Sequence, residues 1–478
     1  MSKKKSQMIT IIALIIVLIA AGIGYFAAVK YQNKKAAGDK EDKSVALNLI
    51  DESSVSKISF SYDGTDMTFE KKNDEWVYTD DEDFPVNQSY VSTMVSDMAG
   101  MTATKLVTSS CKDLSQYKLD DPSIKVEITD KNGKSYNLSV GMDAVAADGC
   151  YVYTDNDTSK IYLAASDFTS DFKKSKNNMM ALPDAPDIKS ANVTSYKVDA
   201  GGSTSFSAVY DKKNSKYNDI YSWNITEPFT QPVAGDQDGL ISLFDKLSSV
   251  TFTEGAEYKS SDKVLKKYGL DSPEYSISVK YFTKNKKKKK YHTYTINVGK
   301  KDSAGENYYV KTSTDKGIYL MSSDIVSALA RPDAFSCAYS NPYLANPETL
   351  NSITMNYKGK KYEMTLTKKK KKKKSSDLES SYDYTAYVDG RKVDGDSFIK
   401  AYKAFASLSY SAAIDKNVKV SDDKEIASIE FKQDKKNVKL RFLSYNDSFY
   451  RIDVDGTMQF VVDKAVVNKD LGAFVKLK

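Results

Sequence analysis

Short runs of alternating apolar and polar residues recur along the chain from residue 58 onward. The first, Ile-Ser-Phe-Ser-Tyr at 58–62, is followed by Asp63-Gly64, a dipeptide typical of a tight hairpin turn. A second pair of runs, at 124–128 and 136–140, flanks Asn132-Gly133. Alternation of this kind predicts strands that bury one face and expose the other to solvent.

Between the groups of predicted strands lie stretches with helical spacing. Residues 90–101 carry apolar side chains at positions 91, 94, 95 and 98, and Ser89 is the expected N-cap. Similar spacing at positions 241, 244 and 247, and across 397–408, predicts two further helices. The predicted fold class is therefore α+β, with mainly antiparallel sheet and one or two helices in each unit.

The strongest regularity is a set of residues that recurs in the same order in two stretches. In both, a Trp is followed nine residues later by a Pro, then by a Tyr-x-Leu-Asp-x-Pro element and a Val-Gly pair. The first set is Trp76, Pro85, Tyr117, Leu119, Asp120, Pro122 and Gly141, and the second is Trp223, Pro232, Tyr268, Gly269, Leu270, Asp271, Pro273 and Gly299. An order kept twice in one chain predicts tandem repeats of one module.

We interpret the recurring residues as module framework, with Tyr and Leu entering the core and Asp and Pro shaping a turn. An aromatic platform for a ligand is the alternative. Pro-rich segments mark the expected boundaries, which give module one at 52–185, module two at 186–340 and a divergent module three at 341–478. The third stretch follows the same plan but lacks the Trp and the Tyr-x-Leu-Asp-x-Pro element.

The amino-terminal segment predicts the compartment. Residues 8–29 form an uncharged apolar run that, at 1.5 Å per residue, makes a helix of about 33 Å, enough to span a bilayer. Residues 1–7 are expected to be a cytoplasmic tail and residues 30–51 a flexible stalk. The apolar core is long for a cleavable signal peptide and no clean cleavage site follows it, so we predict a signal-anchor with the bulk of the chain extracytoplasmic.

Composition narrows the classes of partner. The chain has 70 basic and 64 acidic residues among 478, with the two signs interspersed, and nearly all the basic residues are Lys. Scarce Arg argues against sequence-specific nucleic-acid binding. Two runs stand out: Lys286, Lys287, Lys288, Lys289 and Lys290, and Lys368, Lys369, Lys370, Lys371, Lys372, Lys373 and Lys374. We interpret both as solvated hairpin tips; contact with anionic lipid or wall polymer is the sharper alternative.

The residues that carry chemistry are sparse. One His, His292, and three scattered Cys do not form a typical zinc site and argue against Ser-His-Asp or Cys-His catalysis. Free thiols are the favoured state of Cys111, Cys150 and Cys337, with a Cys111–Cys150 disulfide as the alternative. Acidic clusters at 80–83 and 155–157 lack the pattern of a calcium loop. Paired carboxylates of a glycosidase stay open, because such residues meet in space and not along the chain.

The Tyr-Gly-Leu-Asp-x-Pro element at 268–273, the upstream Trp and Pro, and the downstream Val-Gly, Tyr-Val and Ile-Tyr-Leu strands resemble the bacterial family of domain of unknown function DUF4340. The resemblance covers residues 58–331 well and the last third loosely. At the position of the family's Gly, module one has Lys118, which leaves the turn geometry there open. The resemblance implies a membrane-anchored repeat protein encoded beside ABC-2-type exporters and an auxiliary membrane protein, and it supplies no catalytic residues.

The resulting hypothesis is a single-pass, non-enzymatic binding protein of the bacterial cell envelope that is auxiliary to an ABC-type exporter. It is expected to need no cofactor and no metal, and its expected partners are exporter subunits and an auxiliary membrane protein. Two alternatives stay open: a cell-envelope enzyme that hydrolyses glycan or wall polymer with paired carboxylates, and a structural spacer that contacts the wall.

Overall fold

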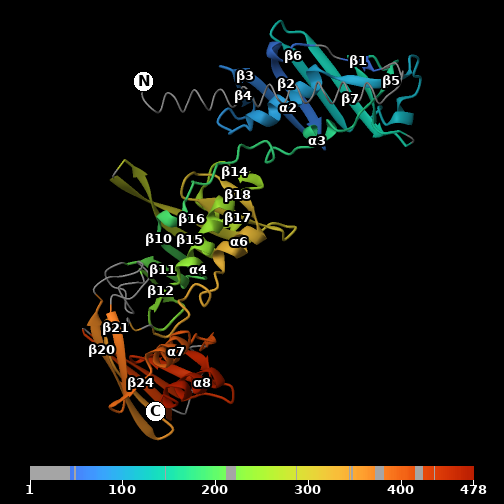
Figure 1. Ribbon diagram of the computed structural model, residues 1–478. Coiled ribbons are helices and arrows are strands. Elements are labelled where there is room, and N and C mark those ends of the chain that lie inside the picture. The colour runs from blue at the N-terminus through green and yellow to red at the C-terminus, as the bar shows by residue number, and fades with distance from the viewer. Residues whose placement is uncertain are drawn as a thin grey trace. The chain divides into compact units, whose positions relative to one another are not determined.

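The computed structural model describes residues 44–477, except 48–49, 146, 212–221, 287, 344, 346–347, 372–381, 415–423 and 435. The chain divides into two compact units between Met179 and Met180. The described residues form three nine-stranded sheets in which every neighbouring pair of strands is antiparallel. The first unit holds one sheet, module one; the second holds the other two, modules two and three (Figure 1).

Module one has the strand order β4-β3-β2-β6-β7-β8-β9-β5-β1. Its strands are β1 (Val45–Ala46), β2 (Val55–Tyr62), β3 (Thr65–Lys72), β4 (Glu75–Tyr78), β5 (Thr102–Thr108), β6 (Ile124–Asp130), β7 (Ser135–Asp143), β8 (Cys150–Thr154) and β9 (Ile161–Ala164). Its helices are α2 (Gln88–Ala99) and α3 (Thr169–Phe172), with short 3-10 helices η1 (Glu52–Ser54) and η2 (Leu114–Tyr117).

Module two has the order β13-β12-β11-β10-β15-β16-β17-β18-β14. Its strands are β10 (Val193–Ala200), β11 (Ser203–Tyr210), β12 (Trp223–Glu227), β13 (Val233–Ala234), β14 (Glu254–Glu257), β15 (Tyr275–Asn285), β16 (Lys288–Lys301), β17 (Asn307–Thr312) and β18 (Ile318–Ser322). Its helices are α4 (Gln237–Asp245), α5 (Asp262–Tyr268) and α6 (Ser323–Ala330), with η3 (Ser190–Asn192) and η4 (Lys246–Ser249).

Module three has the order β22-β21-β20-β19-β24-β25-β26-β27-β23. Its strands are β19 (Leu350–Tyr357), β20 (Lys360–Lys370), β21 (Tyr382–Val388), β22 (Arg391–Val393), β23 (Ala412–Ala413), β24 (Glu425–Gln433), β25 (Asn437–Ser444), β26 (Phe449–Val454) and β27 (Thr457–Asp463). Its helices are α7 (Gly395–Ala406) and α8 (Lys464–Val475).

The three sheets share one topology. Each has a first meander, β2–β4, β10–β13 or β19–β22, then crosses over through a helix to a strand at or next to the far edge of the sheet, and returns with a meander of four strands. We call β5, β14 and β23 the far-edge strands, although β1 lies outside β5 in module one; each pairs with the last strand of its module, β9, β18 or β27. The repeated, mainly antiparallel modules predicted from sequence are confirmed, and the third stretch keeps the topology although it has lost the Trp and the turn element.

Local chemistry accounts for the hairpins. Asp63 and Gly64, which join β2 to β3, have φ angles of 50° and 71°, as the predicted hairpin turn requires. Asn73 and Asp74, with φ angles of 50° and 66°, make the next turn. Asn and Asp tolerate the left-handed region better than other non-glycine residues, so these turns form at modest cost.

Helix α2 begins earlier than predicted. Its N-cap is Asn87, whose side chain accepts a hydrogen bond from the backbone N–H of Tyr90, and not Ser89. Asn and Ser are comparable caps, and here the geometry of the loop from Pro85 places the Asn at the non-helical position. The predicted apolar face is correct: Val91, Met94, Val95 and Met98 are all buried, whereas the face in α4 is centred on Leu240, Leu243 and Phe244.

In each module two helices pack on one face of the sheet, α2 and α3, α4 and α6, or α7 and α8. In module one the ring of Phe172 from α3 packs edge-on against Phe60 of β2, 5.8 Å between centroids, and α2 lies over the same face (Figure 1). In module two Tyr196 is fully buried beneath α4 and α6, and its hydroxyl donates a 2.7 Å hydrogen bond to the carbonyl of Leu329. Burial of apolar side chains under the helices is the main stabilising term of each module.

The segment predicted as tail and membrane helix, residues 1–29, lies outside the described residues, as does most of the predicted stalk. The last residues of that stalk join the first sheet, because β1 pairs with β5 through Val45 and Ala103. Among the described residues no helix is long and apolar enough to cross a membrane.

Candidate functional sites

The Tyr-x-Leu-Asp-x-Pro element and the Val-Gly pair meet at one place in each module. In module two the ring of Tyr268 lies 4.4 Å from that of Tyr309, and Tyr268 and Leu270 belong to a buried cluster with Ile318. A Cβ atom added to Gly299 would lie 2.2 Å from the carbonyl oxygen of Tyr268. The Val-Gly pair is therefore glycine because the backbone of the Tyr-x-Leu-Asp-x-Pro element presses directly against it.

Module one repeats this arrangement. The rings of Tyr117 and Tyr151 are 4.8 Å apart, and a Cβ atom on Gly141 would lie 2.2 Å from the carbonyl oxygen of Tyr117. Leu119 is buried and Asp120 is exposed, in line with the predicted division between core and turn. The same division holds for Leu270 and for Asp271, which is exposed; Pro122 and Pro273 are half-buried.

Lys118 takes the conformation of its glycine counterpart. Its φ angle is 51°, against 70° for Gly269, and in each case the following leucine N–H donates to a carbonyl five residues back, Leu119 to Leu114 and Leu270 to Leu265. The turn geometry that the sequence left open is therefore the same in both modules. A lysine there adopts the left-handed region at a cost of about 1 kcal/mol.

The two Trp residues are buried in corresponding strands, β4 and β12, but have different neighbours. In module two the carbonyl of Trp223 accepts from the N–H of Gly235 next to β13, and the ring packs on Phe244, 5.2 Å between centroids. In module one, among the described residues, β4 is the last strand at this end of the sheet. The side-chain amide of Gln88 donates to the carbonyl of Trp76 (2.8 Å) and accepts from its N–H (2.7 Å). Pro85 and Pro232 are half-buried in the loops that follow.

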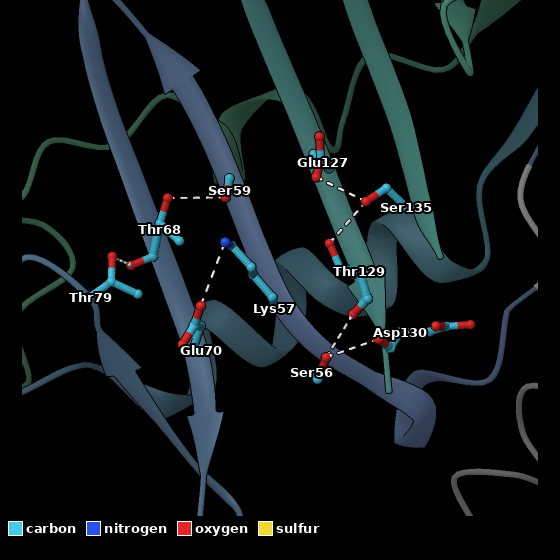
Figure 2. A network of polar contacts seen from close by, with 10 residues as sticks. All are labelled: Ser56, Lys57, Ser59, Thr68, Glu70, Thr79, Glu127, Thr129, Asp130 and Ser135. Carbon is cyan, nitrogen blue, oxygen red and sulfur yellow. Dashed lines mark hydrogen bonds and ion pairs between the residues drawn. The ribbon is translucent and has the colours of Figure 1, made fainter. Parts of the chain in front are cut away.

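The face of the first sheet opposite the helices carries short polar side chains in rows across the strands. Lys57 of β2 forms an ion pair with Glu70 of β3 (3.5 Å). Beside it the hydroxyls of Ser59 and Thr68 are 3.0 Å apart, and Ser135 donates to Glu127 at 3.0 Å (Figure 2). The alternation predicted from sequence thus produces a polar surface on which neighbouring side chains bond across the strands in separate small groups.

This polar surface contains a shallow cleft of about 530 Å³. Its lining includes hydroxyl, amide, phenol and charged groups from five strands: Ser59, Thr68, Lys125, Glu127, Asn137 and Tyr153. We call this the open face of module one. A second cleft, of about 550 Å³, lies beside Trp76 and is lined by Asp51, Glu52 and Lys71 among others. Both clefts are mixed in charge, which suits polar recognition better than apolar ligands.

Sequence reasoning missed one pair of carboxyl groups. Asp97 near the end of α2 is half-buried, and one of its carboxylate oxygens is buried without a hydrogen-bond partner. Burial, together with the charge of Asp171 on α3, raises the pKa of Asp97 to about 6. A signal was present, because an acidic residue in the last turn of a helix opposes the helix dipole. Neither cleft described above is lined by Asp97 or Asp171.

Comparison with known families decides what these modules are. The family model described as domain of unknown function (DUF4340) matches residues 76–219 and 223–427, together more than half of the chain. The chain belongs to the DUF4340 family. No curated protein and no solved structure matches it. The two DUF4340 matches begin at or beside the recurring Trp76 and Trp223, and the second extends into β24 of the third sheet.

The Lys runs of this DUF4340 protein lie differently from the prediction. The first was interpreted as a hairpin tip, but β15 continues to Asn285 and β16 begins at Lys288, so Lys288, Lys289 and Lys290 lie in a strand and not at the tip. An extended ribbon tolerates lysines at every position because both of its faces can reach water. In the second run, Lys368, Lys369 and Lys370 likewise belong to β20, and Lys372, Lys373 and Lys374 lie outside the described residues.

The remaining candidate groups have structural surroundings. The thiols of Cys111, Cys150 and Cys337 are free, and burial raises the pKa of Cys150 and of Cys337 to about 11. The imidazole Nε2 of His292 lies 2.9 Å from the hydroxyl of Thr283. Among the described residues no group of three or more His, Cys, Asp or Glu side chains could hold a metal ion.

Proposed function

We propose that this DUF4340 protein is a membrane-anchored, extracytoplasmic binding protein, auxiliary to an ABC-type export system, and that the open face of module one contacts its partner. The observation that carries the proposal is the architecture of module one. Helices α2 and α3 pack on one side of its sheet, while the other carries polar side chains from five strands around a cleft. The apolar run at 8–29 supports the anchor, and the resemblance to exporter-linked family members supports the partner.

The chemistry of the open face suits a protein partner. Hydroxyl and amide groups of Ser59, Thr68 and Asn137 offer both donors and acceptors, and the sheet beneath holds them in fixed register. Lys125 and Glu127 add one charge of each sign. Polar interfaces of this kind are typical of contacts that form between separately folded proteins, in which preformed surfaces meet with little rearrangement.

The experiment is co-purification of the full chain from its native membrane in mild detergent, with exporter subunits identified by mass spectrometry. The double variant Ser59→Arg, Thr68→Arg fills the cleft of module one, and we expect it to lose the partner. The matched control, Ser278→Arg, Thr295→Arg, places the same two side chains on a cross-strand pair of module two, where both residues are likewise half-buried. Recovery of wild-type protein without any transporter subunit would count against the proposal.

A second candidate, the envelope hydrolase, has one observation in its favour. Asp97 and Asp171 are two interacting carboxyl groups, one of which keeps its proton to about pH 6, as a general acid must. The test is release of fragments from purified cell-wall glycan by the full chain. Hydrolysis that Asp97→Asn abolishes would favour the enzyme over the binding protein. A structural spacer would give neither hydrolysis nor a transporter partner.

A further inference from the structure

Strands β15 and β16 continue beyond the sheet as a two-stranded arm. Strand β10 pairs with β15 as far as Tyr281, and β17 pairs with β16 only from Ile296 onward. Past these points β15 and β16 pair with each other alone, from Phe282–Tyr291 to Asn285–Lys288. Figure 1 shows this hairpin projecting from module two. We call residues 282–286 and 288–291 the basic arm.

The basic arm carries positive charge without compensation. Its lysines are Lys284, Lys286, Lys288, Lys289 and Lys290, and the sequence from 281 to 294 contains no acidic residue. Elsewhere exposed lysines do find carboxylates, as Lys267 does with Glu257 at 3.1 Å. Within the part of the chain that the structure describes, no carboxylate lies within ion-pair distance of an arm lysine. The arm therefore concentrates charge of one sign at the end of a paired hairpin.

Aromatic side chains share one face of the arm with lysines. Because side chains alternate along a strand, Phe282, Lys284, Lys289 and Tyr291 point to the same side. Tyr291 is 63 % exposed, which is unusual for a ring of its size, and the ammonium of Lys289 lies 3.9 Å from the centre of the Phe282 ring. Tyr prefers the boundary between water and lipid, where its ring is dehydrated and its hydroxyl stays wet.

The second Lys run differs in that its positive charges have partners. Lys368 donates hydrogen bonds to the carbonyl of Glu348 and the side chain of Asn351, at 2.8 and 3.3 Å, and Lys371 lies 3.7 Å from Asp383. Among the residues described, strand β20 pairs with β21 alone at these positions, and Lys368 and Lys370 lie opposite the half-buried Tyr384 and Tyr382. This run is thus partly neutralised and held by its neighbours, and it provides a control of equal charge.

We propose that the basic arm docks on an anionic phospholipid surface, with its lysines among the headgroups and Tyr291 at the interface. Lysines near a charged membrane act additively as point charges, and they need no bidentate geometry. The exposed aromatic ring favours lipid over a soluble anionic polymer, which offers no apolar boundary to receive it. The proposal concerns a second contact and does not depend on the exporter partner.

The test uses the full chain reconstituted in nanodiscs of neutral phosphatidylcholine, incubated with vesicles that contain or lack phosphatidylglycerol and then sedimented. Wild-type nanodiscs are expected to sediment with the anionic vesicles only, and less as salt rises. The triple variant Lys288→Gln, Lys289→Gln, Lys290→Gln is expected to lower the partition coefficient roughly 100-fold. The single variant Tyr291→Ser is expected to lower the partition coefficient roughly 5-fold relative to wild type. Circular dichroism checks that each variant keeps its sheets.

The matched control is Lys368→Gln, Lys369→Gln, Lys370→Gln, which removes the same charge and should leave vesicle binding close to wild type. Equal losses in the two triple variants would overturn the proposal in favour of general charge attraction. Absence of binding to anionic vesicles would also overturn it. Two results together would identify an anionic polymer as the occupant instead. Soluble polyphosphate, at a phosphate concentration equal to that of the arm lysines, would displace the protein from the vesicles, and Tyr291→Ser would leave vesicle binding unchanged.

Discussion

The carboxyl group of Asp97 makes the stability of module one depend on pH in an unusual direction. Burial and the neighbouring Asp171 raise its pKa to about 6, above the value near 3.8 of an unperturbed aspartate. The folded state therefore binds the proton more tightly than the unfolded state between these values. The stabilisation of the folded state by protonated Asp97 is present in full below about pH 4. It is lost as the pH rises to about 6, and it stays lost above that.

The perturbation that exposes this effect is Asp97→Asn, which keeps the shape of the side chain and removes its charge. A shift of about two pK units corresponds to about 3 kcal/mol, at 1.36 kcal/mol per unit. Because Asp97 is partly exposed, solvent screening reduces this to about 1–2 kcal/mol. We expect the variant to exceed wild type in free energy of unfolding by that amount at pH 8, and to match it near pH 4.

The assay is urea unfolding of the detergent-solubilised full chain at several pH values. Fluorescence of Trp76 reports on module one when Trp223 is replaced by Phe, since each compact unit holds one of the two Trp residues. Asp113→Asn is the control of opposite sign, because hydrogen bonds from Ser115 lower the pKa of Asp113 and its loss should destabilise module one at high pH. Parallel pH profiles for wild type and Asp97→Asn would refute the reasoning.

Three further predictions concern the framework. The variants Gly299→Ala and Gly141→Ala should each lower the free energy of unfolding of their module by about 2 kcal/mol or more, because the added methyl carbon meets a backbone carbonyl oxygen. Unchanged midpoints of urea unfolding would contradict this close approach. Lys118→Gly should leave module one as stable or about 0.5 kcal/mol more stable, whereas Gly269→Lys should cost module two about 1 kcal/mol, both measured by urea unfolding. Gln88→Ala should lower the free energy of unfolding by about 1–3 kcal/mol, because it leaves the backbone groups of Trp76 in β4 unpaired. The variant should also associate in a concentration-dependent way in analytical ultracentrifugation. A monomeric variant would show that this edge strand does not need the Gln88 side chain to prevent association.

The elements that sequence predicted are those whose information is local. The turn at Asp63-Gly64 and the buried face of α2 follow from dihedral preference and helical period, and both match the structure. The far-edge strand β5 was not predicted, because its residues are mostly polar and its partner β9 comes long after it in the chain. The pairing of Gln88 with Trp76 was also missed. A single side chain that bonds to a strand edge produces no hydrophobic periodicity in the sequence.

The candidate sites divide in the same way. The recurring Tyr, Leu and Gly residues could be singled out because they occur twice, but only coordinates reveal that Gly299 and Tyr268 touch. The lysines were visible as a run, yet their place in paired strands depends on the cross-strand register of Phe282 with Tyr291. The carboxyl pair of Asp97 and Asp171 joins two helices, and no spacing along the chain announces it.

The position of the far-edge strand has a consequence for how each module matures. A chain made from its amino terminus releases β5 well before β9, so Ala103 waits for Ala164, just as Ala412 waits for Val461 in module three. During that interval the backbone groups that will face β9 or β27 have no strand to pair with, although β1 can already pair with the other side of β5. Lys105 and the threonines of β5, and the two-residue length of β23, disfavour pairing with another nascent polypeptide before the sheet is complete.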